Sequence, residues 1–142
     1  MLFRSPGCHD NLVGGGVPAG QTPDQALVRE AWEEAGLQPT EAAQARPAGV
    51  LRLARDIPEG YQFEWLYSYD LALPPGREPA NQDGEVHAFQ CLAPEAALAL
   101  TTGGRMTVDA ALVTLDFALR HGLVADETLA TRFRPLRVVR RG

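Results

Sequence analysis

Two hydrophobic patterns alternate along the chain, and the three- to four-residue spacing typical of helices appears in three segments. The first segment runs from about 23 to 35. Thr22 precedes it as a favourable N-cap, and Gly36 follows as the glycine expected just beyond a helix end. Segments with the same spacing predict a short helix over 94–100 and a longer one over 107–122.

The second pattern is a run of aliphatic and aromatic residues, which alternate with polar residues in some segments, and it is typical of strands. It predicts strands over 48–55 and 61–73, and the turn sequence DIPEG between them predicts a hairpin. A third strand is expected over 85–92, and one short extended segment over 10–14. Strands and helices in this order indicate an α/β sandwich with helices packed on a mixed sheet.

Composition narrows the class of protein without changing this picture. The 142 residues suit a single domain over 1–142, and 45% hydrophobic with 22% charged residues is ordinary for a soluble globular protein. No apolar run approaches the ~20 residues of a membrane span, and two cysteines without metal-ligand spacing fit a reducing, cytoplasmic location. The net charge of -5 argues against nucleic acid as the main partner, so the basic tail, about 130–142, is expected to be a solvated surface.

Three glutamates crowd the last turns of the first predicted helix. Glu30, Glu33 and Glu34 stand at i, i+3 and i+4, so they share one face, where like charges repel and the helix dipole disfavours anions. Arg29 offsets part of this repulsion. The remaining anionic site offers hard oxygen ligands that suit Mg²⁺ or Mn²⁺, although this spacing alone is more typical of a solvated charged face. The opposite side of the helix is expected to pack on the sheet through Leu27, Val28, Ala31, Trp32 and Ala35.

A glycine loop precedes this helix at a fixed distance. Gly15 lies six residues before position 21, and Arg29 lies eight residues after it, directly before the glutamates. Over 15–37 this spacing resembles the Nudix box, G-x5-E-x7-R-E-U-x-E-E-x-G-U, where U is a bulky aliphatic residue. Gln21 and Ala31 depart from the motif. Because Gln21 replaces a peripheral carboxylate of the family, we expect weaker or altered metal binding rather than loss of activity.

The resemblance implies a fold and a chemistry. It implies a Nudix-type α/β/α sandwich with a mixed sheet, and hydrolysis of a small-molecule diphosphate linked to another moiety, with Mg²⁺ or Mn²⁺ neutralising the phosphate oxygens. Glu33 and Glu34 take the positions of the principal metal ligands. Glu30 takes that of a further ligand or of a base acting through water, and Arg29 that of the residue orienting the glutamates.

The resemblance also implies two further groups at the metal site. A loop carbonyl at Gly14 or Gly15 completes the coordination shell in this reading. Family members often recruit an acidic residue from outside the box, for which Glu85 is the best candidate and Asp83 the second. An equally good reading makes Asp-Gly a simple turn and Glu85 a charge at a strand edge. His87, on the same strand face, is expected to be polar surface.

Four motifs resemble one branch of the family, the Nudix domain related to thiamine pyrophosphokinase. They are CHDNLVGGGVPAGQTP, SYDLALP, QDGEVHAF and LVTLDFALRHGLV, in that order, and they extend from about Gly7 to Val124. This resemblance implies conversion of thiamine diphosphate or its oxidised analogues to the monophosphate.

Three other functions remain alternatives to the hydrolysis of a thiamine compound. The chain could be a nucleotide or ADP-ribose pyrophosphatase. It could be a catalytically weak diphosphate-binding module, a reading that Gln21 favours and the intact glutamates of the box oppose. Isomerisation of isopentenyl diphosphate is disfavoured because the sequence offers no convincing Cys–Glu pair.

A thiazolium–pyrimidine substrate would stack on aromatic side chains beside the diphosphate site. The segment FEWLYSY places four aromatic residues on one face of the second predicted strand, namely Phe63, Trp65, Tyr67 and Tyr69. We expect this face to belong to the core. If it faces the pocket instead, Trp65 and Tyr67 are the candidates for substrate contact.

The segment before the glycine run is short. It holds thirteen residues, whereas Nudix domains ordinarily have at least one strand there. We therefore expect the N-terminal strands to be shortened or missing, or the chain to be a fragment of a longer protein. A missing strand leaves a sheet edge open to self-association, so a homodimer is expected.

Overall fold

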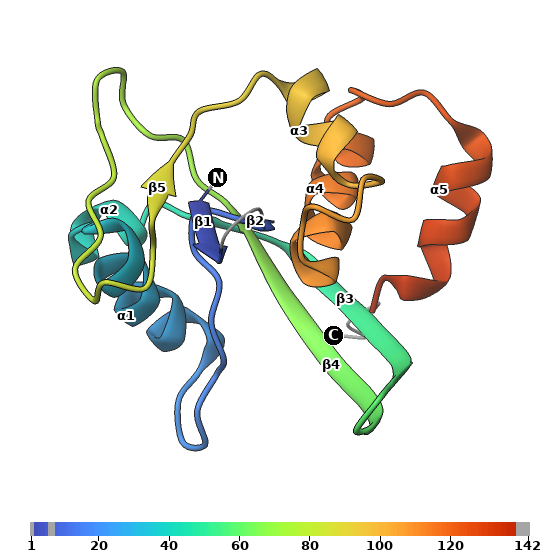
Figure 1. Ribbon diagram of the computed structural model, residues 1–142, viewed down its shortest axis with the longest axis horizontal. Helices are drawn as coiled ribbons and strands as arrows, with labels where there is room; N and C mark the ends of the chain where they lie inside the picture. The colour runs from blue at the N-terminus through green and yellow to red at the C-terminus, as the bar shows by residue number, and fades with distance from the viewer. Residues whose placement is uncertain (1, 6–7, 139–142) are drawn as a thin grey trace.

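The computed structural model describes residues 2–5 and 8–138. Strands and helices follow one another along this part of the chain, which confirms the predicted α/β class (Figure 1). The elements are β1 Leu2–Ser5, β2 Cys8–Asp10, α1 Pro23–Ala35, α2 Pro39–Ala42, β3 Arg46–Ile57, β4 Gly60–Asp70, β5 Ala88–Phe89, α3 Pro94–Leu100, α4 Val108–Arg120, α5 Glu127–Phe133 and the 3₁₀ helix η1 Arg134–Leu136.

The strands form two antiparallel sheets. One has the order β2-β1-β5, and the other is the hairpin of β3 and β4. A parallel bridge between His9 and Met106 ties β2 to the segment before α4. The strands before the glycine run are therefore present but short, with four and three residues. The strand expected over 85–92 is reduced to the two residues of β5.

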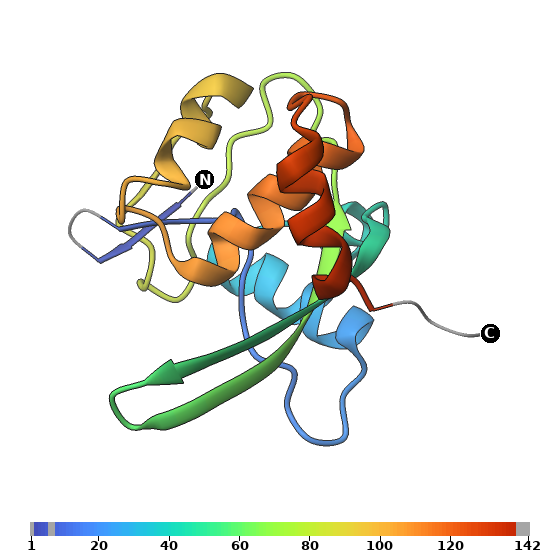
Figure 2. The same cartoon turned by 90° about the vertical axis from the view of Figure 1, so that its right-hand side faces the viewer.

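The β3–β4 hairpin is the longest paired unit among the described residues. Its two strands pair from Arg46 opposite Asp70 to Ile57 opposite Gly60, with one bulge between Pro47 and Gly49. The predicted hairpin is thus confirmed, with β3 extending beyond both predicted ends. Figure 2 shows that the end of the hairpin projects away from the helices.

Helix α1 begins and ends where its sequence predicts. The Thr22 hydroxyl accepts a hydrogen bond from the Gln25 backbone N–H at 3.2 Å, and the Gln25 side chain accepts from the Thr22 N–H at 3.0 Å. Gly36 ends the helix at φ 63°, a conformation that favours glycine. A Cβ at this position would also lie 2.6 Å from the Ala80 carbonyl oxygen. The absence of a side chain at Gly36 therefore permits both the left-handed turn and the close approach of the 80–84 loop.

The core beside α1 is built mainly from small residues. Ala31, Ala35, Leu37 and Ala42 are buried together, with half-buried side chains packed around them: Leu12, Val13, Val28, Leu71 and Leu73. The prediction that Trp32 packs inward is wrong, since it is 43% exposed. Glu34, in contrast, is buried at 1% exposure. Small side chains at positions 31 and 35 let neighbouring segments approach closely, so the covered strip of the helix includes the glutamate.

Helix α4 covers one face of the hairpin. Leu51 and Leu53 are buried on this face. Glu64, which pairs opposite Leu53, lies beside Asp109 in the first turn of α4 and contributes to raising the pKa of Asp109. Since side chains alternate along a strand, the opposite face of the hairpin points away from α4.

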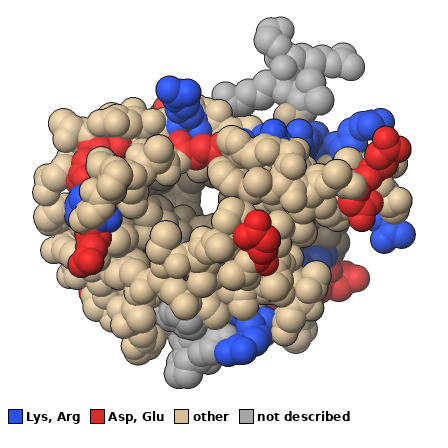
Figure 3. Space-filling view, turned by 90° about the horizontal axis from the view of Figure 1, so that it is seen from above, with Lys and Arg blue, Asp and Glu red and all other residues tan. Residues whose placement is uncertain are grey.

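The surface carries charges of both signs. On the face seen in Figure 3, acidic and basic side chains are interspersed among uncharged residues rather than gathered by sign. The predicted basic tail is largely helical up to Leu136, and residues 139–142 lie outside the described part of the chain. Among the described residues, the helices are too short or too polar to span a bilayer.

Candidate active site

Glu34 anchors the glycine loop to α1. Its Oε2 accepts a hydrogen bond from the Gly14 backbone N–H at 2.8 Å. The carboxylate is buried, and such a charge-assisted bond inside the protein is stronger than one in water. The predicted metal ligand Glu34 therefore faces the loop, beside the predicted carbonyl ligand Gly14.

Gly15 lies directly against the carboxylate of Glu30. A Cβ added at this glycine would overlap the Glu30 side chain, whereas a Cβ at Gly16 would meet nothing within 4 Å. The first glycine of the motif thus lies in close contact with the first glutamate, whose carboxylate would have to shift to admit a side chain. This contact gives a physical reason for the fixed distance between the loop and the helix.

Arg29 connects the glutamates with each other and with the loop. Its guanidinium lies 2.8 Å from Oε1 of Glu30 and 3.1 Å from Oε2 of Glu33, and it donates to the Gly16 carbonyl at 3.4 Å. The side chains of Glu30 and Glu33 are 15% and 40% exposed, so both carboxylates reach the surface. This position suits the predicted role of Arg29 as the residue that orients them.

The oxygen ligands of the site are of the type that a hard divalent cation prefers, although the carboxylates do not converge on one point. Glu30, Glu33 and Glu34 are anionic oxygen donors next to the main-chain carbonyls of the loop. Within residues 2–5 and 8–138, no group of three acidic, histidine or cysteine side chains is arranged to hold a metal. Arg29 pairs with two of the glutamates while the third faces the loop. These three glutamates are the residues that would hold a cation.

The loop carrying Asp83 and Glu85 is docked on the end of α1. The Gln82 and Asp83 N–H groups donate to the Glu33 carbonyl at 2.9 and 3.2 Å, and the Ala80 N–H donates to the Ala35 carbonyl at 2.9 Å. These bonds satisfy carbonyls that a helix end leaves unpaired. The loop is thereby fixed beside the last turn of the box helix.

Glu85 itself is exposed and takes part in a local turn. Its N–H donates to Oδ1 of Asp83 at 2.9 Å, which is the turn arrangement. The structure does not gather the Glu85 carboxylate with the box glutamates into a metal cluster. His87 is exposed, as expected for polar surface.

The aromatic face of β4 is open. Tyr61, Phe63, Trp65 and Tyr67 are 66%, 53%, 49% and 36% exposed, so the expectation that this face belongs to the core is wrong. Helix α4 covers the opposite face, which carries the aliphatic residues instead. These aromatic residues form a row along β4. At its inner end, the Tyr69 hydroxyl donates to the Asp24 carboxylate in the first turn of α1. The row therefore begins beside the box helix and continues outward past Tyr67 and Trp65.

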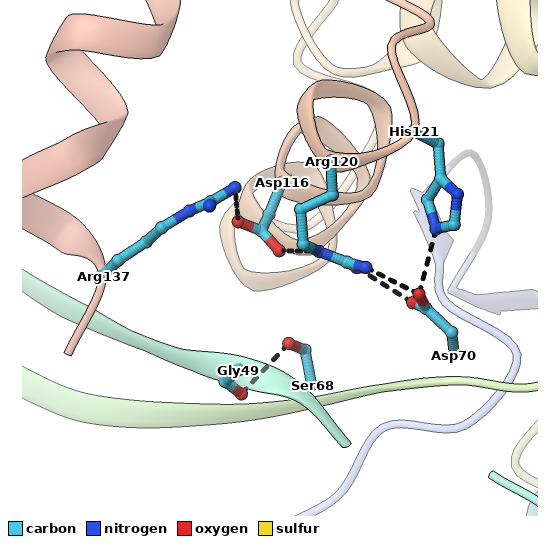
Figure 4. Close-up of polar contacts among 7 residues, drawn as sticks. All are labelled: Gly49, Ser68, Asp70, Asp116, Arg120, His121 and Arg137. Atoms are coloured by element: carbon cyan, nitrogen blue, oxygen red, sulfur yellow. Dashed lines mark hydrogen bonds and ion pairs between the residues drawn. The ribbon is translucent and has the colours of Figure 1, made fainter. Parts of the chain in front are cut away.

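A network of ion pairs around the buried Asp116 joins the end of β4 to α4 (Figure 4). Arg120 donates to both oxygens of Asp70 at 2.6 and 2.9 Å and to Asp116 at 2.7 Å. Arg137 reaches the other oxygen of Asp116 at 2.7 Å, and His121 lies 3.1 Å from Asp70. Hydrogen bonds from Arg120 hold the pKa of Asp70 below its usual range, and the pKa of Arg120 is raised.

The sequence patterns did not predict a network among these residues. The signal that could have found this network was present, because SYDLALP contains Asp70 and LVTLDFALRHGLV contains Asp116 and Arg120. Two motifs noted separately in the sequence meet here in space. Their charged residues hold the hairpin against α4.

Most of the chain matches a known protein family and two known proteins. A family model described as NUDIX domain matches residues 2–110. Two curated proteins of Arabidopsis thaliana are similar: Nudix hydrolase 24, chloroplastic, is 40% identical over 127 residues, and Nudix hydrolase 20, chloroplastic, is 34% identical over 124 residues. Each match covers 87% of this chain. The chain spans about a third of the length of these relatives, 34% and 33%.

Proposed function

The chain belongs to the Nudix family, and from this premise we propose that it is a metal-dependent pyrophosphohydrolase cleaving a diphosphate linkage in a small molecule. The observation that carries the proposal is the fit of the glycine loop to α1. Gly15 is packed on Glu30, whose carboxylate would have to move to admit a side chain, and the Gly14 N–H donates to Glu34. A solvated charged face would not require either contact.

Each group of the site has a distinct task in this proposal. A divalent cation, when bound, supplies charge neutralisation at the diphosphate oxygens and activates water. Glu30, Glu33 and Glu34 provide the negative oxygen donors, and Arg29 holds the first two in position before substrate arrives. Preorganised charges lower the barrier because they need no rearrangement as charge shifts. The exposed main chain at Gly15 and Gly16 leaves space for phosphate groups beside these carboxylates.

For the substrate, we propose thiamine diphosphate or one of its oxidised analogues. The four motifs that resemble the thiamine pyrophosphokinase-related branch support this choice, and the open aromatic row supports a substrate with flat rings. At ~3.3 Å per strand residue, Tyr67 and Trp65 lie about 7 and about 13 Å along β4 from Tyr69, which touches α1. Of these two rings, that of Tyr67 is the nearer to α1.

ADP-ribose and nucleotides also carry a flat ring, so a substrate panel is the direct test. Phosphorus NMR would follow cleavage of thiamine diphosphate, its oxidised analogues, ADP-ribose and nucleoside triphosphates, with Mg²⁺, with Mn²⁺ and with EDTA. Metal-dependent cleavage of the thiamine compounds alone is the expected result. Cleavage of nucleotides alone would keep the hydrolase and reject the substrate. Metal-dependent binding without cleavage of any compound would reject the hydrolase in favour of a diphosphate-binding module.

A further inference from the structure

The distal part of the hairpin presents an apolar face with no partner among the described residues. On β4, Tyr61, Phe63 and Trp65 are each about half exposed or more. Their directly paired neighbours on β3 share the same face. We call this surface the outer hairpin face: Arg52, Ala54, Asp56, Tyr61, Phe63 and Trp65.

The small-molecule site does not account for most of this surface. Tyr61 lies eight residues along β4 from Tyr69, so about 26 Å separates it from the point where the strand touches α1. Phe63 is about 20 Å from the same point. A substrate whose diphosphate lies at the box glutamates would not extend this far, so the end of the hairpin is open to another partner.

The charges on the outer hairpin face are self-complementary. Arg52 and Asp56 lie four residues apart on β3, with the small Ala54 between them. Both side chains are exposed, and neither side chain has a hydrogen bond or ion pair within residues 2–5 and 8–138. A two-fold axis passing near Ala54 would place Arg52 of each copy opposite Asp56 of the other. In such an isologous contact the same surface serves both partners.

We propose that the outer hairpin face is an interface between two copies of this chain, stacked face to face in antiparallel orientation about an axis near Ala54. Phe63 pairs opposite Ala54, so its ring lies at the centre of the contact. Trp65 and Tyr61 lie on either side of it, next to the charged residues Arg52 and Asp56. The small side chain of Ala54 in each copy allows the two sheets to approach to the ~10 Å typical of packed sheets.

Stacking on a single-stranded nucleic acid would also use exposed aromatic rings, and the charges disfavour it. Nucleic-acid platforms combine aromatic side chains with a positive groove that follows the backbone. Here the one arginine of the face is balanced by one aspartate, and the whole chain carries a net charge of -5. A second copy offers the opposite charges in the positions required.

The area available indicates a weak dimer. A buried aromatic residue covers about 150–250 Å², so three half-exposed rings contribute about 300 Å² from each copy, well below the ~800 Å² per partner of a standard interface. We therefore expect a dissociation constant of roughly 10 µM to 1 mM. Sedimentation velocity of the full chain from about 5 to about 500 µM would show the dimer forming across this range.

Charge reversal tests the geometry of the contact. Arg52→Asp or Asp56→Arg alone puts like charges together twice in each dimer, and each should weaken association by about 10-fold. The double variant R52D/D56R restores opposite charges and should return to within about 3-fold of the original chain. Arg132→Asp on α5 is the matched control and should leave association unchanged. Circular dichroism of every variant confirms that it is folded.

Four results would overturn the proposal. The chain could remain a monomer up to ~500 µM. It could form a dimer that neither single reversal weakens, or one that the double variant fails to restore. Quenching of tryptophan fluorescence in the monomer by an oligothymidylate, lost in Phe63→Ser, would assign the face to nucleic acid instead. None of these results depends on hydrolase activity, so this inference and the proposed function fail separately.

Discussion

At the scale of single residues, the neighbouring glycines 15 and 16 differ only in their surroundings. A side chain at Gly15 would overlap the Glu30 carboxylate, which ends a flexible side chain and can move aside, while Gly16 faces open space. We therefore expect Gly15→Ala to fold with nearly unchanged stability but to lose at least about 10-fold in kcat/KM, since misplaced catalytic groups cost rate. Gly16→Ala should retain the activity of the original chain.

Steady-state kinetics and thermal melts of the two variants check this prediction together. Equal losses of activity in Gly15→Ala and Gly16→Ala would show that loop flexibility, not the contact with Glu30, matters. A large fall in melting temperature for Gly15→Ala alone would assign the contact to stability. The prediction requires a fall in rate without a fall in stability.

The sequence predicted the face of the glutamates but not the environment of each one. Helical periodicity places Glu30, Glu33 and Glu34 together, and the structure keeps that neighbourhood. Burial of Glu34 depends on the path of the glycine loop, to which it is hydrogen bonded, and periodicity within the helix contains no information about that path. Trp32 was misplaced for the same reason.

At the scale of elements, the ion network should matter for the hairpin's attachment to α4. Asp70→Asn removes the charged partner of Arg120, and breaking such a half-buried pair is expected to cost about 1–2 kcal/mol of unfolding free energy. Because the pKa of Asp70 is lowered in the folded chain, its contribution is complete above the ordinary carboxyl pKa of ~3.9 and is lost as the pH falls through the lower folded pKa.

Urea unfolding between pH 7 and pH 2 checks this prediction. The original chain should lose more stability on acidification than the variant, so the two curves should converge at low pH. Glu41, whose pKa Arg77 lowers to about 2, keeps its own pH dependence in both proteins. A constant difference at every pH would mean that Asp70 acts through packing rather than charge.

A second contact between elements, at Asp109, depends on pH in the direction opposite to that of Asp70. Burial and the neighbouring Glu64 raise the pKa of Asp109, with Asp10 adding to the rise and Arg55 opposing it. A raised carboxyl pKa favours folding at low pH, and this benefit is lost as the pH rises through the folded value. Ionised Asp109 therefore destabilises the contact between α4 and β4 at neutral pH.

Asp109→Asn should raise the melting temperature at pH 7 by about 3 °C, and the gain should vanish near pH 3, where both proteins carry a neutral side chain. Glu95→Gln, in the first turn of α3, is the matched control and should show no such pH-dependent gain. Calorimetry at the two pH values provides the measurement. Destabilisation of Asp109→Asn at pH 7 would contradict the repulsion inferred here.

Local signals account for the elements that the sequence predicted correctly. Caps define the ends of α1, and alternation with a short turn defines the β3–β4 hairpin, because both depend on neighbours in the chain. The remaining features depend on distant segments. Which face of the hairpin α4 covers was not readable from alternation, since one face is aliphatic and the other aromatic. The strand expected over 85–92 shortens to β5 because its partner β1 pairs at only two positions, Leu2 and Phe3.

At the scale of the whole molecule, the glycine loop, α1 and the 80–84 loop form one unit, while α4 and the ion network hold the hairpin. This arrangement places the aromatic row beside the box helix and leaves its outer part free for a second copy. The family and the α/β class were predictable because the box spacing is specific. The substrate and the pairing of surfaces were not, because they depend on how distant elements meet.

The central claim is that the box glutamates on α1 carry a metal-dependent hydrolysis. The most direct measurement compares Glu33→Gln with Glu95→Gln on the best substrate of the panel at saturating Mg²⁺. Glu33 is partly exposed, so its variant should stay folded, and we expect a loss on the order of 100-fold in kcat/KM, with Glu95→Gln unchanged. Equal activity of both variants and the original chain would contradict the claim.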